Sequence, residues 1–317
     1  STSDSKYNSG RRRGVVKILV VGGTGMIGGH AALYLQSLGH DVAIAGRRPP
    51  QETTALVNLP FLQGDFMAGT FTREQLAPFE AVVFAAGNDI RHLPKGENFS
   101  EHVLRSNAQC VPDFAALCRD AGVSRFVHIG SFYPHVAPEL MATNDYIRSR
   151  QLAVDGIIAL AGPDFHVCSL DAPFVVGTVP GMRLPMFQGY VRYAEGKMEG
   201  LEPYGPTGGT NFISCRSLSE AIGGALERAE NGKAYLVGDE NLGFAEYFAL
   251  FFKAAGNPAS VPALDKEHPF LPDVGIYTGR GNYVRYEPDA ADTALLGYRR
   301  NDITAAVEEI VAQFRSH

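Results

Sequence analysis

The sequence is poor in the residues that build metal centres and disulfide frameworks. Its 317 residues include only 4 cysteines. Three of these cysteines lie in apolar stretches that are typical of a buried core, and none has a neighbour at metal-ligand spacing. We therefore interpret them as reduced, buried thiols, which favours a cytoplasmic protein without a metal site. The four residues are Cys110, Cys118, Cys168 and Cys215.

Long apolar runs and an excess of positive charge are also missing. No uninterrupted apolar stretch is long enough to cross a membrane, and no secretory segment precedes the first predicted strand. The net charge of −6 at pH 7 argues against nucleic acid as the main partner. The basic run Arg11–Arg13 lies in a polar, Ser-rich stretch. We therefore predict that residues 1–14 form a disordered leader.

Near its N-terminus the sequence contains a glycine-rich turn between a strand and a helix. The apolar run 18–21 predicts a buried strand. The turn Gly22-Gly-Thr-Gly-Met-Ile-Gly28 follows, and a helix is predicted over 29–38. A strand, a glycine turn and a helix in this order are typical of a dinucleotide-binding unit. A glycine-rich loop without any ligand is the alternative.

Each glycine of the turn has a predicted role. Gly22 permits the tight turn, Gly25 lets the backbone approach a pyrophosphate, and Gly28 lets the helix pack closely on the strand. The start of the helix offers free N–H groups and a positive dipole end to that phosphate. The other turn residues that we expect to contact the cofactor are Thr24, Met26 and Ile27.

Strand-like and helical segments alternate along the first half of the chain, which predicts an α/β fold with a doubly wound, parallel, Rossmann-type sheet. The predicted strands span 17–21, 41–45, 60–63, 81–85, 125–129 and 164–170. The predicted helices span 29–38, 72–77, 100–121 and 145–161. Prolines and glycines interrupt this alternation after Asp171. Later segments predict strands at 211–214 and 234–237, helices at 217–230, 244–255 and 301–314, and a loop over 259–272.

These patterns divide the chain into two parts. Residues 15–171 are predicted to form the dinucleotide-binding domain, and the chain is expected to return to its sheet at about 207–238. A smaller C-terminal substrate-binding lobe is predicted from 172–206 and 239–317. Such a lobe would lie over the C-terminal edge of the sheet, where ligands bind in open α/β folds.

The end of the second predicted strand bears on the choice of cofactor. An acidic residue there binds the ribose 2′-hydroxyl of NAD and repels a 2′-phosphate. This chain has Arg47 and Arg48 instead. A guanidinium group suits phosphate because of its bidentate fork. The pair therefore favours NADP(H) over NAD, unless both arginines are merely solvated loop residues.

Three further residues form a candidate catalytic set. Ser131 ends the fifth predicted strand, and Tyr146 and Arg150 lie near the start of the following helix. Positions i and i+4 share one face of a helix, so the tyrosine and the arginine are expected to face the same site. A strand-end cap and a packed aromatic residue are the structural alternatives for Ser131 and Tyr146.

These motifs resemble those of the extended short-chain dehydrogenase/reductases, the NAD-dependent epimerase/dehydratase family, over about residues 17–256. Within this family, the motifs are most similar to those of dihydroflavonol-reductase-like and hydroxysteroid-dehydrogenase-like members. The set Ser131…Tyr146-x-x-x-Arg150 is similar to the family's Ser…Tyr-x-x-x-Lys triad. The resemblance implies that the tyrosine is a general acid or base and that the serine holds the substrate oxygen. It also implies that residue 150 binds the nicotinamide ribose.

Arg150 departs from the family pattern, which has a lysine there. A guanidinium supplies positive charge and can contact ribose hydroxyls, but it does not give up a proton. Three hypotheses follow: an enzyme with an altered proton relay, a slow enzyme, or a cofactor-binding sensor that resembles NmrA-like proteins.

The resemblance also implies further cofactor contacts. Asp65, with Phe66 beside it, matches the aspartate that accepts from the adenine amino group. Asn107 matches a structural or proton-relay asparagine, and a surface asparagine is its alternative. The segment 171–177 resembles a stretch whose backbone contacts the nicotinamide carboxamide. The remaining implied contacts are small residues beneath the cofactor and two residues of that last stretch: Ala85, Ala86, Gly87, Pro173 and Val176.

Methionines and aromatic residues after residue 180 make an adaptable apolar surface that favours a bulky, apolar substrate. Packing within the lobe is the equal alternative. Tyr133 is either a substrate contact or a competing catalytic tyrosine, although it lacks a cation at i+4. The main hypothesis is thus an NADP(H)-dependent oxidoreductase, and a sugar-nucleotide epimerase or dehydratase is the alternative. The apolar helices 100–121 and 145–161 resemble the family's dimer interface, so we expect a homodimer. The predicted substrate contacts of the later segment are Met186, Phe187 and Tyr190.

Overall fold

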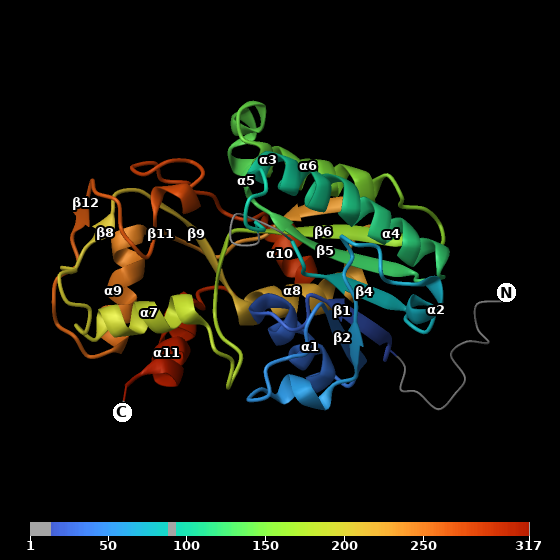
Figure 1. Ribbon diagram of the computed structural model, residues 1–317, viewed down its shortest axis with the longest axis horizontal. Helices are drawn as coiled ribbons and strands as arrows, with labels where there is room; N and C mark the ends of the chain where they lie inside the picture. Colours follow the sequence, from blue (N-terminus) through green and yellow to red (C-terminus); the bar gives the residue numbers. More distant parts are fainter. Residues whose placement is uncertain (1–13, 88–92, 317) are drawn as a thin grey trace.

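The computed structural model describes residues 14–87 and 93–316, which form a parallel sheet with a smaller lobe beside it (Figure 1). The sheet has seven strands in the order β10-β6-β5-β4-β1-β2-β3, and all pairs between them are parallel. This confirms the predicted doubly wound, Rossmann-type fold. The strand order reverses between β1 and β4, which places a ligand-binding crevice at their carboxyl ends. The strands span Lys17–Val21 (β1), Asp41–Gly46 (β2), Phe61–Gln63 (β3), Ala81–Phe84 (β4), Arg125–Ser131 (β5), His166–Ala172 (β6) and Lys233–Leu236 (β10).

Helices cover both faces of this sheet because its strands are apolar on both sides. Along β1, Ile18 and Val20 face one hydrophobic cluster, whereas Leu19 and Val21 face the other. Met26–Ser37 (α1), Cys215–Arg228 (α8) and Ala290–Leu296 (α10) lie on the first side. The helices of the second side are Arg73–Leu76 (α2), Cys110–Asp120 (α4) and Asp145–Ile158 (α6). The predicted leader, residues 1–14, lies outside the described residues except for Gly14.

The helix predicted over 100–121 is interrupted. It consists of Phe99–Val103 (α3), a π-helical turn over Leu104–Gln109, and α4. Pro112 explains the break, because its nitrogen carries no proton for a helical hydrogen bond and its ring would collide with a carbonyl one turn earlier. Single π-helical turns occur often at functional sites, and this one contains Asn107.

The C-terminal lobe has a small sheet of its own, in the order β11-β9-β7. Its strands are Phe174–Val176 (β7), Gly209–Ser214 (β9) and Glu240–Gly243 (β11). In the segment 207–238, only β10 pairs with the large sheet, since β9 pairs with β7 and β11. Three helices pack around this lobe: Pro185–Ala194 (α7), Phe244–Ala254 (α9) and Ile303–Phe314 (α11). The shorter elements are Tyr133–Val136 (α5), Gly205–Pro206 (β8), Ala263–Leu264 (β12) and 3₁₀ turns at Ala55–Asn58, Pro138–Ala142 and Asp273–Gly275.

None of the helices within the described residues is long and apolar enough to cross a lipid bilayer.

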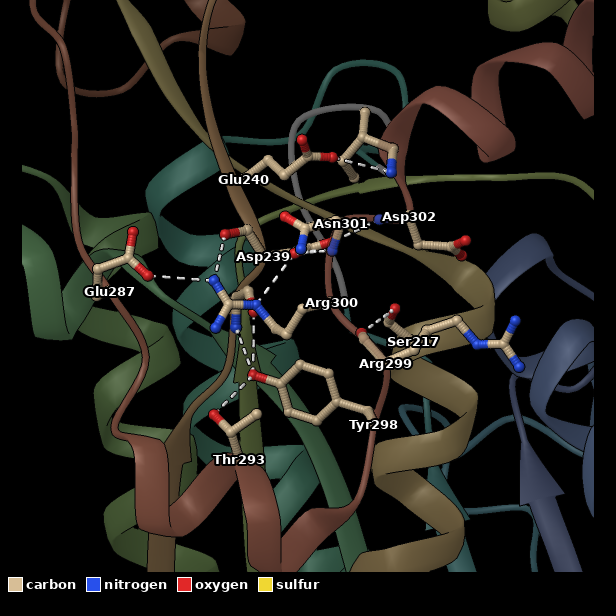
Figure 2. Close-up of polar contacts among 12 residues, drawn as sticks. Ser217, Asp239, Glu240, Glu287, Thr293, Tyr298, Arg299, Arg300, Asn301 and Asp302 are labelled. Carbon is tan, nitrogen blue, oxygen red and sulfur yellow. Dashed lines mark hydrogen bonds and ion pairs between the residues drawn. The ribbon is translucent and has the colours of Figure 1, made fainter.

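A buried carboxylate ties the end of the chain to the rest of the fold (Figure 2). The side chain of Asp239 is fully buried, and its Oδ1 accepts from Nε of Arg300 at 3.0 Å and from the backbone N–H of Asn301 at 2.7 Å. Its Oδ2 accepts from the backbone N–H of Asp302 at 3.0 Å. Arg300 also reaches the exposed Glu287, and Tyr298 donates to the carbonyl of Gly238. These bonds hold the segment before α11 against the chain that follows β10.

We expect Asp239→Ala to lower the free energy of unfolding by about 3–5 kcal/mol, because it leaves the partly buried Arg300 and two backbone N–H groups without their acceptor. Urea unfolding monitored by circular dichroism measures this loss. Glu287→Gln is the matched control, since it removes the exposed partner of the same arginine and should cost less than about 1 kcal/mol. Equal losses for both variants would show that the buried carboxylate has no special role.

Candidate active site

The glycine turn has the shape of a phosphate-binding loop. Gly22 has φ +80°, and a Cβ there would lie 2.7 Å from the backbone of Ala85. A Cβ at Gly28 would collide with the carbonyl oxygen of Gly22, as the predicted close packing of helix and strand requires. At Gly25, by contrast, the nearest other atom is the carbonyl oxygen of Gly22 at 3.6 Å. The space above Gly25 is therefore open to a ligand.

The start of α1 is free to bind an anion. Gly25 is its N-cap, no side chain caps it, and its first turn contains no acidic residue. The first N–H groups of a helix have no partner within the helix, and here they belong to Met26 and Ile27. A pyrophosphate satisfies such N–H groups and the positive end of the helix dipole. Thr24 packs against Gly46 at the end of β2, so the loop lies beside the predicted ribose position.

Arg47 and Arg48 are both exposed directly after β2. Within 14–87 and 93–316, neither guanidinium group forms an ion pair with a carboxylate. The segment from Gly46 to Gln51 contains no acidic residue. The end of β2 thus presents two free cations where an NAD-specific site presents a carboxylate.

Asp65 and Phe66 lie after β3, and their side chains make different contacts. Oδ1 of Asp65 accepts from the backbone N–H of Met67 at 2.9 Å, so this oxygen shapes the turn. The ring of Phe66 packs edge-on against Phe84, with 4.9 Å between their centroids. Its side chain belongs to the hydrophobic cluster under the sheet edge. The adenine contact of Asp65 stays a prediction.

The structure brings Tyr146 and Arg150 together on α6. Both side chains are buried, and Nη1 of Arg150 lies 3.4 Å from the hydroxyl oxygen of Tyr146. The other terminal nitrogen, Nη2, donates to the carbonyl of Ile129 at 2.9 Å. That anchor fixes the guanidinium against β5. At 3.4 Å the contact with Tyr146 is a weak hydrogen bond, so the charge acts on the hydroxyl mainly through its field.

Gly87 owes its lack of a side chain to this arginine. A Cβ at Gly87 would lie 2.6 Å from Nη1 of Arg150. The guanidinium therefore lies against the chain just after β4, where Ala85 and Ala86 follow the strand with small side chains. The sequence predicted only a close cofactor approach at Gly87, and the structure adds a packing requirement.

Ser131 ends β5 and is buried. Its hydroxyl oxygen accepts from the backbone N–H of Tyr133 at 3.2 Å, which leaves the hydroxyl proton free to be donated. Tyr133 follows at the start of α5. Burial raises the pKa of Tyr133, and the neighbouring Tyr146 adds to the rise. Within the described residues no cation lies beside the Tyr133 hydroxyl, whereas Nη1 of Arg150 lies beside that of Tyr146.

Asn107 reaches α6 from the π-helical turn. Its Nδ2 donates to the hydroxyl oxygen of Ser149 at 3.2 Å, and Ser149 donates to the carbonyl of Tyr146 at 2.7 Å. All three residues are buried. The π-helical turn thus holds Asn107 against the turn of α6 that carries Tyr146, and the surface alternative for Asn107 is wrong.

Aromatic side chains surround Tyr146. The ring of Tyr277, from the lobe, stacks on it with 4.7 Å between the centroids and 16° between the planes. Tyr277 also meets Tyr133 edge-on at 5.3 Å, and Phe99 lies parallel to Tyr146 at 6.4 Å. No local motif in the sequence marks Tyr277 as a neighbour of Tyr146. Only the fold of the lobe brings residue 277 to α6.

Several predicted contacts do not join this site. Phe187 and Tyr190 are each 2% exposed in the hydrophobic core of the lobe, and Tyr190 donates to the carbonyl of Phe270. Met186 is exposed on α7. Packing against α9 thus explains the apolar pattern of this segment better than substrate binding. Val176 lies in β7 with its side chain in the lobe core, and Pro173 is buried just after β6, so the contact predicted for these two residues rests on their backbone and stays a prediction.

A cavity of about 400 Å³ lies elsewhere, between α1, α8 and the chain after β7. Its lining includes His30, Tyr34 and Arg216 but none of the predicted site residues. Arg216 is already bound to Asp302 and Glu309. This cavity is therefore separate from the Tyr146 site.

The sequence between residues 18 and 238 matches the model of the NAD dependent epimerase/dehydratase family. The chain belongs to this family. The match covers the glycine turn, Ser131, Tyr146 and the strands that position them. No curated protein matches the sequence significantly.

Solved structures share the fold at low sequence identity. The Bordetella bronchiseptica enzyme WbmH, solved with NAD⁺, superposes with a TM-score of 0.72 at 17% identity and covers 95% of this chain and 99% of its own. A UDP-N-acetylglucosamine 4-epimerase from Bacillus cereus gives 0.69 at 16% identity, over 95% and 97%. MoeE5, solved with UDP-glucuronic acid and NAD, gives 0.70 at 19% identity, over 94% and 99%. These likenesses concern the fold alone.

Proposed function

We propose that this protein binds a nicotinamide dinucleotide and catalyses hydride transfer at a carbon that carries a hydroxyl or carbonyl group. The arrangement of Tyr146 and Arg150 carries this proposal. The buried hydroxyl oxygen of Tyr146 lies 3.4 Å from Nη1 of the fixed Arg150 guanidinium, near the carboxyl ends of the strands. The glycine turn and the uncapped start of α1 fit a pyrophosphate. When bound, the nicotinamide accepts or supplies the hydride.

The residues of the chain do the rest of the chemistry. Tyr146 gives its phenolic proton to the substrate oxygen, or takes a proton from it in the reverse direction. Ser131 donates a hydrogen bond to the same oxygen and stabilises the charge that develops there. The Arg150 guanidinium stabilises negative charge on the tyrosine oxygen through its field. Arg150 holds no proton that it can release, so the proton of Tyr146 must be replaced by another route.

We infer an apolar substrate from what surrounds Tyr146. Tyr277, Tyr133 and Phe99 offer aromatic surface around the tyrosine.

A second candidate is epimerisation or dehydration of a nucleotide sugar. The likeness to the Bacillus cereus epimerase and to MoeE5 favours it. A screen with two arms separates the candidates. One arm measures NADPH oxidation in the presence of cyclic and aryl ketones. The other measures whether the protein converts UDP-glucose, UDP-N-acetylglucosamine or UDP-glucuronic acid into another sugar nucleotide. Turnover of ketones alone supports the oxidoreductase, and sugar interconversion alone replaces it with the second candidate.

We propose NADP(H) as the cofactor, and predict that NADPH binds at least about tenfold more tightly than NADH. Arg47 and Arg48 supply charge-assisted hydrogen bonds to a 2′-phosphate. Changing both to alanine should remove most of the preference and leave NADH affinity nearly unchanged. Calorimetric titration with both nucleotides measures this.

The control for this prediction is Arg119→Ala with Arg192→Ala, because it removes the same charge from two distant exposed sites. It should leave the preference intact. WbmH and MoeE5 were solved with NAD, so equal affinity for the two nucleotides, or tighter NADH binding, would assign this chain to NAD instead.

A further inference from the structure

A second pair of ionisable groups lies at the carboxyl ends of β5 and β6. Asp171, on β6, is 2% exposed, and its Oδ2 lies 2.6 Å from Nε2 of His135 on α5. Its Oδ1 accepts from the hydroxyl of Ser169 at 2.6 Å. The hydroxyl oxygen of Ser169 is also 2.9 Å from Nδ1 of His128. The four side chains form one continuous chain of hydrogen bonds.

The two histidines of this chain differ in access. His128 is fully buried, and burial, assisted by the charge of Arg150, lowers the pKa of His128 to about 3. His128 therefore stays neutral and forms the buried end of this chain of hydrogen bonds. His135 leaves 29% of its side chain exposed. Since Nε2 of His135 is held by Asp171, Nδ1 is the nitrogen that remains for a ligand, and no described residue bonds to it.

The pair lies at the same carboxyl edge of the sheet as Ser131, one register position away. In the sheet register Asp171 pairs with Gly130 and Ala172 pairs with Ser131. Gly130 lacks a side chain for a local reason, because a Cβ there would collide with Oδ1 of Asp171. The backbone of α5 begins directly after Ser131, and α5 packs against α6, which carries Tyr146.

The C-terminal lobe contacts the same region of the sheet. Tyr286 contacts Phe132, the residue just before α5, with 6.4 Å between the ring centroids. The hydroxyl of Tyr286 donates to the carbonyl of Val237, whose own N–H donates to the carbonyl of Asp171. The pair thus lies at the junction of sheet edge and lobe, on the side of the sheet where α6 presents Tyr146.

We propose that His135, oriented by Asp171, is a second acid–base group of this active site, which exchanges a proton with a carbon next to the substrate carbonyl. The proposal rests on the proposed function, because it takes the ketone of that reaction as its substrate. A buried carboxylate that holds one imidazole nitrogen and leaves the other free is the arrangement by which proteins orient a catalytic histidine.

The step balances without any further reagent. Nδ1 of neutral His135 takes the proton from the α-carbon. The electron pair of that C–H bond becomes the C=C bond of an enolate, and the negative charge moves to the oxygen. Hydrogen bonds from Ser131 and Tyr146 stabilise that oxygen. Return of a proton from the imidazolium to the same face of the carbon restores the ketone, with exchange of the hydrogen at that carbon. The substrate class is thus a ketone or secondary alcohol with a hydrogen on the neighbouring carbon.

Hydrogen–deuterium exchange tests this step apart from hydride transfer. The protein is saturated with NADP⁺, so that no hydride is available, and incubated in D₂O with cyclohexanone or acetophenone as the probe. Deuterium at the α-carbon is followed by NMR. We expect exchange by the parent protein, and a loss of at least about 100-fold in His135→Ala. Added imidazole should restore at least about tenfold of the lost rate, since it replaces the missing base.

Two further measurements separate chemistry from structure. His166→Ala, at the opposite end of β6, should change neither the exchange rate nor single-turnover hydride transfer from NADPH, which should each stay within about threefold. In the protein without cofactor, diethyl pyrocarbonate should label His135 faster than His166, and Asp171→Asn should slow the labelling of His135 at least about fivefold.

The outcomes are distinct. The proposal is overturned if the parent shows no exchange, or if His135→Ala leaves the exchange rate unchanged. It is also overturned if His135→Ala loses both exchange and hydride transfer and imidazole restores neither. So does labelling of His135 that is no faster than that of His166, or that Asp171→Asn does not slow. Loss of hydride transfer in the parent itself overturns the proposed function instead, and the second acid–base role falls with it.

Discussion

Tyr146→Phe should lower the rate of hydride transfer at least about 1000-fold, while the affinity for NADPH stays within about twofold. The variant removes only the phenolic oxygen, which lies 3.4 Å from Nη1 of Arg150. The ring of phenylalanine keeps the stacking on Tyr277, so the fold around α6 is retained. Stopped-flow absorbance of NADPH with a ketone from the screen, under single-turnover conditions, measures the rate.

Tyr133→Phe is the matched control, since it removes a phenolic oxygen from a tyrosine that is also buried and also touches Tyr277. Its rate should stay within about threefold of the parent. If Tyr146→Phe and the parent agree within error, Tyr146 is not the proton donor. The role would then pass to Tyr133, or the chain would bind the cofactor without turning it over.

Gly25→Val should weaken NADPH binding at least about 100-fold and leave the free energy of unfolding nearly unchanged. Gly25 has φ −90° and ψ −178°, an extended conformation that any residue adopts. Its missing Cβ has open space around it, so valine fits within the protein itself. The same side chain would stand where the pyrophosphate approaches the start of α1. Calorimetric titration and thermal unfolding together test this separation.

Gly28→Ala provides the contrast, because a Cβ there collides with the carbonyl oxygen of Gly22 inside the protein. It should lower both stability and binding. If Gly25→Val unfolds as readily as Gly28→Ala, then the openness at Gly25 is not a ligand site. If Gly25→Val binds NADPH as the parent does, the phosphate does not approach this loop.

The parts of the fold that the sequence predicted are those governed by short-range patterns. The glycine turn is marked by three glycines at fixed spacing, and two of them prove to be required by backbone approach within the chain. The apolar runs predicted the strands of the large sheet because both faces of a parallel sheet are buried. The i, i+4 spacing of Tyr146 and Arg150 likewise predicted their contact.

Features that depend on contacts between distant segments were not predictable. Phe187 and Tyr190 belong to residue types that suit either a binding surface or a core, and only the packing of α7 on α9 decides for the core. The stacking of Tyr277 on Tyr146 joins residues 131 positions apart. The bond between His135 and Asp171 depends on the register of β5 and β6. A π-helical turn at Asn107 had one local signal, Pro112, which marks a break in a helix but not its type.

The most direct test of the central claim follows the hydrogen itself. NADPH that carries deuterium at C4 of the nicotinamide is mixed with the protein and a ketone that the screen identifies, and the alcohol product is examined by mass spectrometry. The account predicts that the deuterium appears on the carbon that bears the new hydroxyl group, and that Tyr146→Phe abolishes its appearance. Tight binding of NADPH without transfer of deuterium to any ketone or sugar of the screen would contradict the account and leave the chain as a cofactor-binding protein.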